Sequence, residues 1–267
     1  MLANERRNRL LELVRRQGFA SLPQLAAELG VSESTVRRDL DQLEESGAAQ
    51  RIHGGVCYTG PSPKLTHFDQ IQSRNWEKKR QIAQRAAELI EEGDTILLDG
   101  GSTTYELARL LTGRPLQVVT NSLPVANLFS SRPEAELIMV GGYLHSTSGV
   151  MVGEYAEAML RNLKVRTAVI SAAGVTETGL YNSNHMIAST QRAMIEAAEE
   201  VLLVADSTKF GRQSIAKVCD LTEIDHVVVD KHLETQWRDA IQAAAVGLTL
   251  AEDMPEDAST ESTNHPS

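Results

Sequence analysis

The feature that most constrains the fold is an alternation of short apolar runs with polar turns and helical patterns over residues 77–251. The segments that show it are TILLDGGSTTYELARLL, LQVVTNSLPVANLF, ELIMVGGYL, TAVISAAGV, RAMIEAAEEVLLVADSTKFG and DHVVVDK. Strands buried on both faces read as short β-branched or apolar runs, with helices forming the connections between them. The pattern therefore predicts an α/β domain with a mostly parallel sheet covered by helices on both faces.

The first 58 residues follow a different pattern. Apolar positions three and four apart predict a helix over about residues 3–17, a second helix between Ser21 and Gly30, and a third over residues 33–45. The run AAQRIHGGVCYT after them indicates two short strands around a turn. This outline is that of a winged helix-turn-helix domain over residues 1–58.

The third of these helices carries the polar residues that a DNA-reading helix needs. Its apolar positions share one face, which leaves both arginines on or near the outer face. The N-terminal part of such a helix enters the major groove, where arginine can contact guanine edges and Ser or Thr can contact phosphate or base. The candidate DNA-binding residues are Ser32, Ser34, Thr35, Arg37 and Arg38, together with Arg51 and His53 in the hairpin.

These side chains also have simpler interpretations. Arg37 and Arg38 can be an exposed pair on a solvated helix, and either can contact phosphate rather than a base. Asp41 is interpreted as a helix-surface charge, and His53 as a turn-stabilising residue or a DNA contact. The formal charge of −10 does not decide the matter, because residues 1–56 hold equal numbers of basic and acidic side chains. DNA binding depends only on the charges that meet phosphates.

A polar turn follows several predicted strands of the α/β domain. Ligands of open α/β sheets bind outside the carboxyl ends of the strands, so these turns are expected to converge. Hydroxyl and backbone N–H groups at a helix start favour an anion, and lysine adds a positive charge. The candidate effector-binding residues are Asp99, Gly101, Ser102, Thr103, Thr104, Thr120, Asn121, Ser122, Gly141, Gly142, Gly174, Asp206 and Lys209.

A phosphorylated sugar suits this set of groups, with Asp99 and Asn121 available for sugar hydroxyls. Each turn alone has a structural alternative. The GSTT segment can be an ordinary helix start, Asp99 can be structural, TNS can be a plain N-cap, and Lys209 can be a surface charge. The recurrence of such turns after strands favours a pocket.

The sequence resembles the DeoR-type, or glycerol-3-phosphate-repressor-type, bacterial transcriptional regulators. The segments that carry the resemblance are VSESTVRRDLDQLEESG followed by RIHGG, then GDTILLDGGSTTYELARLL, VVTNS, VGG and LLVADSTKFG, and it covers about residues 3–232. The resemblance implies a sensor domain similar in fold to ribose-phosphate isomerases and CoA transferases. It also implies a repressor of a carbohydrate-metabolism operon, released from double-stranded operator DNA by a phosphorylated sugar or polyol.

The sequence departs from that family at two places. The stretch NSNHMIASTQRAMI has no acidic residue where relatives commonly carry one, and Ile187 falls near that place. Arg166 stands where relatives often have Asp. His185 and Asn184 are alternative sources of a polar contact, or else part of an exposed loop.

An enzyme is the alternative to a regulator. Asp99, Asp206 and Lys209 could form an acid–base set in a sugar-phosphate isomerase. No nucleophile motif, metal-ligand spacing or paired-carboxylate arrangement is evident, so we expect no catalytic residues, metal or cofactor. A DNA-reading domain joined to such a pocket is better explained by sensing, and half-site recognition predicts a homodimer or homotetramer.

The remaining features concern the ends of the domains and the cellular setting. Residues 59–76 are polar and Pro-rich and are expected to be a linker, and residues 252–267 a disordered tail. The longest apolar runs are too short to span a membrane, and the N-terminus lacks a secretory signal. Cys57 and Cys219 suggest no disulfide framework, which fits a cytoplasmic protein.

Overall fold

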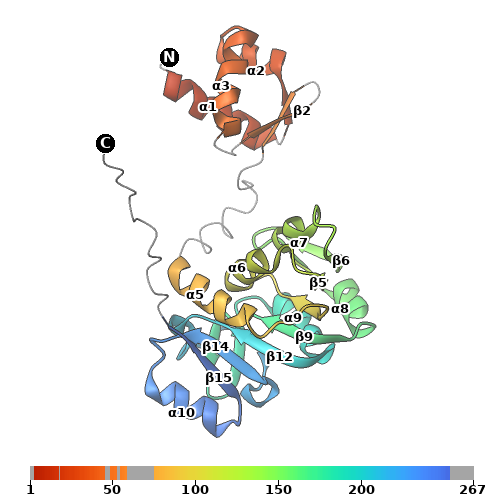
Figure 1. Ribbon diagram of the computed structural model, residues 1–267, viewed down its shortest axis with the longest axis vertical. Coiled ribbons are helices and arrows are strands. Elements are labelled where there is room, and N and C mark those ends of the chain that lie inside the picture. Colours follow the sequence, from red (N-terminus) through yellow and green to blue (C-terminus); the bar gives the residue numbers. More distant parts are fainter. Residues whose placement is uncertain (1–2, 18, 46–48, 53–54, 59–74, 253–267) are drawn as a thin grey trace, which may run out of the picture. The chain divides into compact units, whose positions relative to one another are not determined.

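The computed structural model describes residues 3–17, 19–45, 49–52, 55–58 and 75–252 (Figure 1). The chain divides into two compact units, Met1–Gln70 and Ile71–Ser267. The predicted linker lies outside the described residues except for Asn75 and Trp76, and the predicted tail lies outside them except for Glu252.

The first unit contains the three predicted helices and the predicted hairpin. Its elements are α1 (Ala3–Gln17), β1 (Phe19–Ser21), α2 (Leu22–Leu29), α3 (Glu33–Glu45), β2 (Ala49–Ile52) and β3 (Gly55–Tyr58). The strands form an antiparallel sheet in the order β1-β3-β2, of which β1 was not predicted. Gly30 has a φ of 64°, which permits the tight turn between α2 and α3. The fold is a winged helix-turn-helix.

The core of this unit is made by one apolar face of each helix. Leu10 of α1, Leu25 of α2, and Val36 and Leu40 of α3 are buried against one another and against Val56 of β3. These positions recur at helical spacing, so the polar faces of the helices remain outside.

The second unit is built around one sheet. Its elements before the middle of the unit are α5 (Trp76–Ala87), β4 (Thr95–Leu98), α6 (Ser102–Leu111), β5 (Gln117–Thr120), α7 (Leu123–Phe129), β6 (Glu136–Met139), β7 (Tyr143–His145), β8 (Val150–Val152) and α8 (Glu154–Arg161). The later elements are β9 (Val165–Ile170), β10 (Gly174–Thr176), β11 (Gly179–Asn182), α9 (His185–Glu196), β12 (Ala198–Val204), η2 (Ser207–Lys209), β13 (Ala216–Cys219), η3 (Leu221–Glu223), β14 (His226–Asp230), α10 (Thr235–Ala243) and β15 (Gly247–Ala251).

The central sheet has seven strands in the order β15-β14-β12-β9-β4-β5-β6, and every neighbouring pair is parallel. The chain builds outward from β4 through β5 to β6, then returns to β9 and builds outward on the other side. The strand order therefore reverses between β4 and β9, which is the point where open α/β sheets bind ligands. A small antiparallel sheet, β10-β11-β13, and the hairpin β7-β8 were not predicted.

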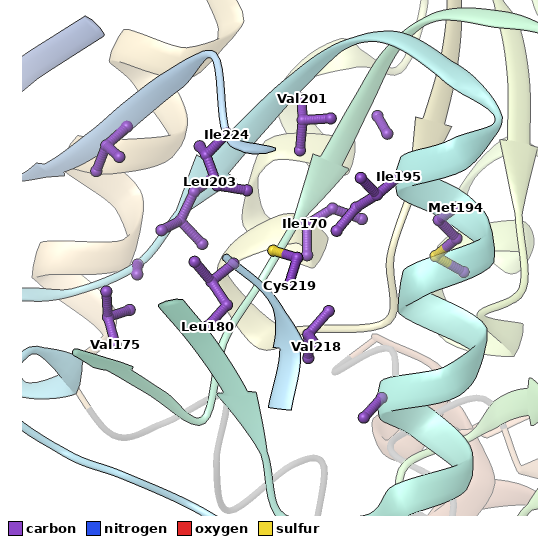
Figure 2. Packing of buried hydrophobic residues seen from close by; sticks show 14 of the residues in the cluster. Ile170, Val175, Leu180, Met194, Ile195, Val201, Leu203, Val218, Cys219 and Ile224 are labelled. Carbon is purple, nitrogen blue, oxygen red and sulfur yellow. The ribbon is translucent and has the colours of Figure 1, made fainter. Parts of the chain in front are cut away.

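Helices cover both faces of the sheet, as the alternation predicted. Ile96 and Leu98 of β4 pack into one cluster with α5, α6 and α7, while Leu97 between them packs into the cluster on the other face with α8, α9 and α10. Figure 2 shows part of the second cluster, where Cys219 lies among apolar side chains. Burial raises the pKa of the Cys219 thiol to about 12, so the thiol is protonated at neutral pH.

The periodicity of the segment EKKRQIAQRAAELIEEGD predicts a helix that ends at Gly93, but α5 is shorter. It ends at Ala87, and the chain then turns until β4 begins. The guanidinium of Arg114 donates to the carbonyl oxygens of Ala87, at 3.0 Å, and of Ile90. The carboxylate of Asp94 accepts the N–H of Glu91 at 2.8 Å. These contacts satisfy backbone groups that a longer helix would have used, and they could not be inferred from helical periodicity.

We predict that Gly174→Ala destabilises the second unit by about 1–3 kcal/mol, because a Cβ at this position would lie 2.1 Å from the backbone oxygen of Arg212. Gly141→Ala is the matched control, since a Cβ there meets no atom within 4 Å, and its effect is expected to stay within about 0.5 kcal/mol. Urea unfolding followed by tryptophan fluorescence tests this, because Trp76 and Trp237 both belong to the second unit. Equal unfolding midpoints for the two variants would contradict it.

Candidate functional sites

The N-terminus of α3 brings three of the predicted DNA-binding residues together. The Ser32 hydroxyl accepts the N–H of Thr35 at 3.3 Å and caps the helix. It also lies 2.9 Å from the hydroxyls of Ser34 and Thr35. Ser32 and Ser34 are exposed and Thr35 is half-buried, so this end of the helix presents hydroxyls to the solvent.

The two arginines of α3 occupy different surroundings. Both are exposed, and Arg37 lies 3.8 Å from Glu33 one turn earlier. Arg38 instead lines a concave surface between α1 and α3. We call this surface the α1–α3 concavity; its residues are Arg6, Arg7, Thr35, Arg38, Asp39 and Gln42.

A partly buried ion pair between α1 and α3 lies in the α1–α3 concavity. The guanidinium of Arg6 donates from Nε to Asp39 Oδ2 at 2.6 Å and from Nη2 to Asp39 Oδ1 at 3.1 Å. Asp39 is buried, and this two-pronged contact fixes α1 against α3. The charge of Arg6 is thereby balanced by Asp39, while Arg7 and Arg38 make the surface basic. Sequence reasoning missed Arg6 and Arg7, because only the packing of α1 on α3 places them beside Arg38, and it also missed Gln42, one turn after Arg38 on α3.

The predicted hairpin residues are described only in part. Arg51 belongs to β2, but its side chain lies outside the described part of the chain, as does all of His53.

The carboxylate of Asp99 is the centre of a hydrogen-bonded junction at the point between β4 and β9 where the strand order reverses. Asp99 Oδ2 accepts the N–H and hydroxyl of Ser171, at 3.1 and 2.6 Å, and the amide of Gln191 at 2.8 Å. Its Oδ1 accepts the N–H of Gly100 at 2.7 Å. The junction joins the ends of β4 and β9 to α9, and Asp99 is buried. Groups of the protein therefore use most of the hydrogen-bonding capacity of the Asp99 carboxylate, which corresponds to the structural interpretation of this residue.

Beside this junction, α6 begins without a side-chain cap. Its N-cap is Gly101, and a Cβ there would lie 2.0 Å from Ser171 Oγ, so a larger residue would collide with the junction. Ser102, Thr103 and Thr104 in the first turn are buried. The helix dipole and the free N–H groups of such a turn favour an anion.

Two buried polar atoms near the strand ends lack partners within the described residues. They are the hydroxyl oxygen of Thr104 and Oδ1 of Asn121. Thr104 is fully buried and Asn121 is 2% exposed. Asn121 follows β5, the strand that pairs with β4, and its amide nitrogen donates to the carbonyl of Met151 at 2.8 Å. A buried polar atom without a partner is costly, so each atom is a candidate contact for a polar ligand.

Other predicted effector residues serve the backbone. Thr120 Oγ1 donates to the carbonyl of Leu98 at 2.7 Å, and Ser122 caps α7, which is the plain N-cap alternative. Gly142 and Gly174 allow backbone oxygens of neighbouring segments to approach, since a Cβ would lie 2.9 Å and 2.1 Å from them. Gly141 lies in the turn that follows β6, the last strand at that side of the sheet, and is exposed.

The end of β12 contributes the last predicted pair. Asp206 is buried and caps the short η2 turn by accepting the N–H of Thr208 at 3.0 Å. Lys209 ends this turn and is half-buried. Within residues 75–252, no hydrogen bond or ion pair engages the amino group of Lys209, so its charge is available to a ligand.

The two departures from the family pattern have different positions. Arg166 lies at the amino end of β9, where Nη1 contacts Asp94 Oδ1 at 2.6 Å and Glu91 Oε2 at 3.3 Å. Arg166 therefore lies at the edge of the sheet opposite the carboxyl ends of the strands, away from the polar turns that follow them. Ile187 is half-buried in the first turn of α9, one turn before Gln191.

The polar contact in this stretch comes from Gln191, which sequence reasoning missed. Besides reaching Asp99, its amide nitrogen donates to the carbonyl of Ser171 at 2.9 Å, and its oxygen accepts from Asn182 at 2.9 Å. Asn184 caps α9 by accepting the N–H of Met186 at 2.9 Å, and His185 is exposed. Gln191 thus places a polar side chain on the inward face of α9.

The described ranges contain neither a metal-binding cluster nor a membrane-spanning helix. No group of three or more His, Cys, Asp or Glu side chains there is arranged to hold a metal ion. None of the described helices combines the length and apolar character that a membrane span requires.

Comparison with known proteins identifies both units. Residues 6–61 match the DeoR-like helix-turn-helix domain, and residues 74–231 match the DeoR C-terminal sensor domain. Together they define a DNA-binding regulator that carries its own sensor domain. The chain belongs to the DeoR family of transcriptional regulators.

Curated relatives align with nearly the whole chain. A putative aga operon transcriptional repressor of Escherichia coli O157:H7 is 34% identical, over 92% of this chain and 93% of the relative. The L-fucose operon activator of Haemophilus influenzae is 33% identical, over 86% and 93%. The glycerol-3-phosphate regulon repressor of Escherichia coli K12 is 33% identical, over 86% and 92%. Among solved structures, ribose 5-phosphate isomerase A of Methanocaldococcus jannaschii is similar over 49% of this chain and 53% of that chain, at 20% identity and a TM-score of 0.37.

We predict that Asp99→Asn destabilises the second unit by about 2–3 kcal/mol. The NH₂ group of the asparagine would point at N–H or hydroxyl donors of the protein, and the substitution would also remove the negative charge to which those groups donate. Asp239→Asn, at an exposed position of α10, is the control and is expected to have little effect. Thermal unfolding followed by tryptophan fluorescence measures both. The role given to Asp99 is wrong if the two variants unfold at the same temperature.

Proposed function

We propose that this protein represses a carbohydrate-metabolism operon and leaves its operator when a small phosphorylated sugar or polyol binds at the carboxyl ends of the central strands. The observation that carries the proposal is the pair of buried, unpartnered polar atoms of Thr104 and Asn121 beside the uncapped start of α6. A rigid scaffold that leaves such atoms unsatisfied is suited to a ligand that satisfies them.

The arrangement suits a phosphorylated ligand. The phosphate would lie at the N-terminus of α6, where Ser102, Thr103 and Thr104 offer N–H and hydroxyl groups. Lys209 would add a positive charge, and Asn121 Oδ1 would accept a hydroxyl of the carbon chain. Asp99 would act as a positioning residue for Gly101 and the start of α6, because its oxygens are engaged within the protein.

The relatives support the carbohydrate class. Their names refer to a glycerol-3-phosphate regulon, an aga operon and an L-fucose operon. Two of these relatives are named as repressors and one as an activator. The choice of repression in our proposal rests on that majority. The effector itself is inferred from the charge and hydrogen-bonding groups of the site.

The DNA-binding half uses α3 in two ways. Arg37 and Ser34 on the exposed face would reach base edges in the major groove. The α1–α3 concavity would receive a backbone phosphate, since Arg7 and Arg38 bring positive charge there and Thr35 and Gln42 bring hydrogen-bonding groups. A homodimer or homotetramer would place two such surfaces on two half-sites.

Sensing explains the site better than catalysis. An isomerase would need a carboxylate free to move a proton. Asp99 holds four hydrogen bonds from the protein, and Asp206 caps η2. The effector would shift DNA affinity only through a difference in its own affinity for two states, and a tenfold shift requires about 1.4 kcal/mol of coupling.

The operator can be recovered by sequencing genomic fragments that co-purify with the protein, and DNA binding is then measured by fluorescence anisotropy. We predict that Arg37→Ala relaxes base specificity by about 1–3 kcal/mol at one position of each half-site. Arg38→Ala is expected to weaken binding to all sequences alike and to lower the slope of log affinity against log salt by about 1.

Arg85→Ala is the control for these variants, because it removes an exposed, ion-paired arginine from α5 in the other unit. It is expected to leave operator binding unchanged. If neither Arg37→Ala nor Arg38→Ala alters the titration, α3 does not contact DNA as proposed.

For the effector, we predict that phosphorylated sugars or polyols release the operator while their unphosphorylated counterparts do not. Thr104→Val and Lys209→Met are each expected to raise the concentration needed for release by roughly 10–100-fold, from the loss of hydrogen bonds to a charged group. Thr112→Val, at the other end of α6, removes a hydroxyl that contacts only a backbone carbonyl and is the matched control. Equal release by the unphosphorylated compounds would contradict an anion site.

A further inference from the structure

The first turn of α5 is attached to the carboxyl ends of two strands. Lys78 Nζ donates to the hydroxyl of Ser207 at 2.8 Å and lies 3.1 Å from Asp230 Oδ1. Asn75, the N-cap of α5, donates from Nδ2 to Asp206 Oδ1 at 3.4 Å. We call these five residues the α5 latch. They join one helix to the loops that follow β12 and β14.

Asp230, one of the two acidic members of the latch, is fully buried. Asp230 accepts the N–H and hydroxyl of Ser207, at 2.6 and 2.9 Å, and the N–H of His232 at 3.2 Å. Burial alone would raise its pKa, but the hydrogen bonds from Ser207 and Lys78 outweigh that effect and hold the pKa below its ordinary value. Asp230 is therefore ionised at neutral pH and requires a partner such as Lys78.

The latch lies next to the candidate effector turn. Ser207 begins η2 and Lys209 ends it, and the N–H of Lys209 donates to the carbonyl of Asp206 at 2.9 Å. A ligand whose phosphate attracts Lys209 would therefore displace one end of this three-residue turn. The other end of the turn contacts Lys78 and Asp230.

The latch also lies where the chain leaves the sensor unit. Residues 59–74 connect α5 covalently to the helix-turn-helix unit, and Asn75 is the residue that follows them. Asn75 has a φ of 53°, in the left-handed region, and its carbonyl accepts the N–H of Lys79 at 3.1 Å. A change in the latch would therefore alter the backbone at Asn75, the first described residue of the sensor unit.

We propose that Lys78 is a positioning residue for DNA binding: its bonds to Ser207 and Asp230 hold the start of α5 in the DNA-binding form, and an effector at Lys209 loosens them. This inference rests on the proposed function, because it assigns the route by which the effector site acts. Disruption of the latch should mimic the effector without any ligand present.

The test compares Lys78→Met with Arg80→Met in the full-length protein. Both variants remove one positive charge from α5, but Arg80 is exposed and lies outside the latch. At constant salt and without any sugar phosphate, Lys78→Met is expected to raise the operator Kd about tenfold, while Arg80→Met leaves it unchanged. Equal affinities for Lys78→Met and the parent, or equal losses in both variants, would overturn the proposal.

Hydrogen exchange of the same proteins supplies a readout that needs neither DNA nor effector. Lys78→Met should speed exchange of peptides that cover Ser207–Lys209 as well as those that cover the first turn of α5, while the rest of the sheet remains protected. Unchanged exchange at Ser207–Lys209 would show that Lys78 does not hold the turn, and the proposal would fail. Exchange that rises throughout the second unit would assign Lys78 a general role in stability and would also overturn it.

These outcomes are separable from the fate of the proposed function. In the parent protein, sn-glycerol 3-phosphate and inorganic phosphate, each at about 10 mM, serve as probes of effector release. This concentration is high enough to occupy a site with a millimolar dissociation constant. If neither probe releases the operator but Lys78→Met weakens operator binding, the latch stands and the assigned effector chemistry is wrong. If sn-glycerol 3-phosphate releases the operator from the parent and Lys78→Met matches the parent, the effector site stands and the latch is wrong.

Discussion

The carboxylate of Asp99 is the interaction on which the sensor unit depends. It lies where the strand order reverses, and it joins the end of β4 to the end of β9 and to α9 through Ser171 and Gln191. The same junction leaves room only for glycine at position 101, which is why α6 begins without a side-chain cap.

The two units divide charge in a way that suits a switch. The helix-turn-helix unit pairs Arg6 with Asp39 and presents Arg9, Arg37 and Arg38 toward solvent. The sensor unit carries the net negative charge of the chain but keeps Lys209 without a partner among the described residues at one end of its sheet. A net negative charge disfavours non-specific contact with DNA. Positive charge is thus present locally in both units, at α3 and at Lys209.

Local sequence rules predicted those parts of the structure that depend on neighbouring residues. Ser32 caps α3, Gly30 breaks the chain before it, and the strand ends carry the polar turns, because caps, turns and periodicity act over a few residues. The partners of buried polar groups were not predictable in the same way. Gln191 meets Asp99 across 92 residues of sequence, and Arg6 meets Asp39 across 33.

Those long-range partners changed the meaning of several predicted residues. Asp99 was predicted as a contact for sugar hydroxyls, yet the structure directs its oxygens to Ser171, Gln191 and Gly100. The end of α5 at Ala87 depends on Arg114, which belongs to the connection between α6 and β5. A single sequence shows that such polar residues exist, but the packing of distant elements decides what they bind.

The reversal of strand order also has a consequence for how the chain acquires its structure during synthesis. The central pair of the sheet joins β4 to β9, and β9 leaves the ribosome only after β5, β6, the β7-β8 hairpin and α8 have been made. Contacts between such distant segments form slowly, whereas the helix-turn-helix unit needs only contacts within its own short stretch. We therefore expect nascent chains to display a folded helix-turn-helix unit while the sheet of the sensor unit is still open at its middle.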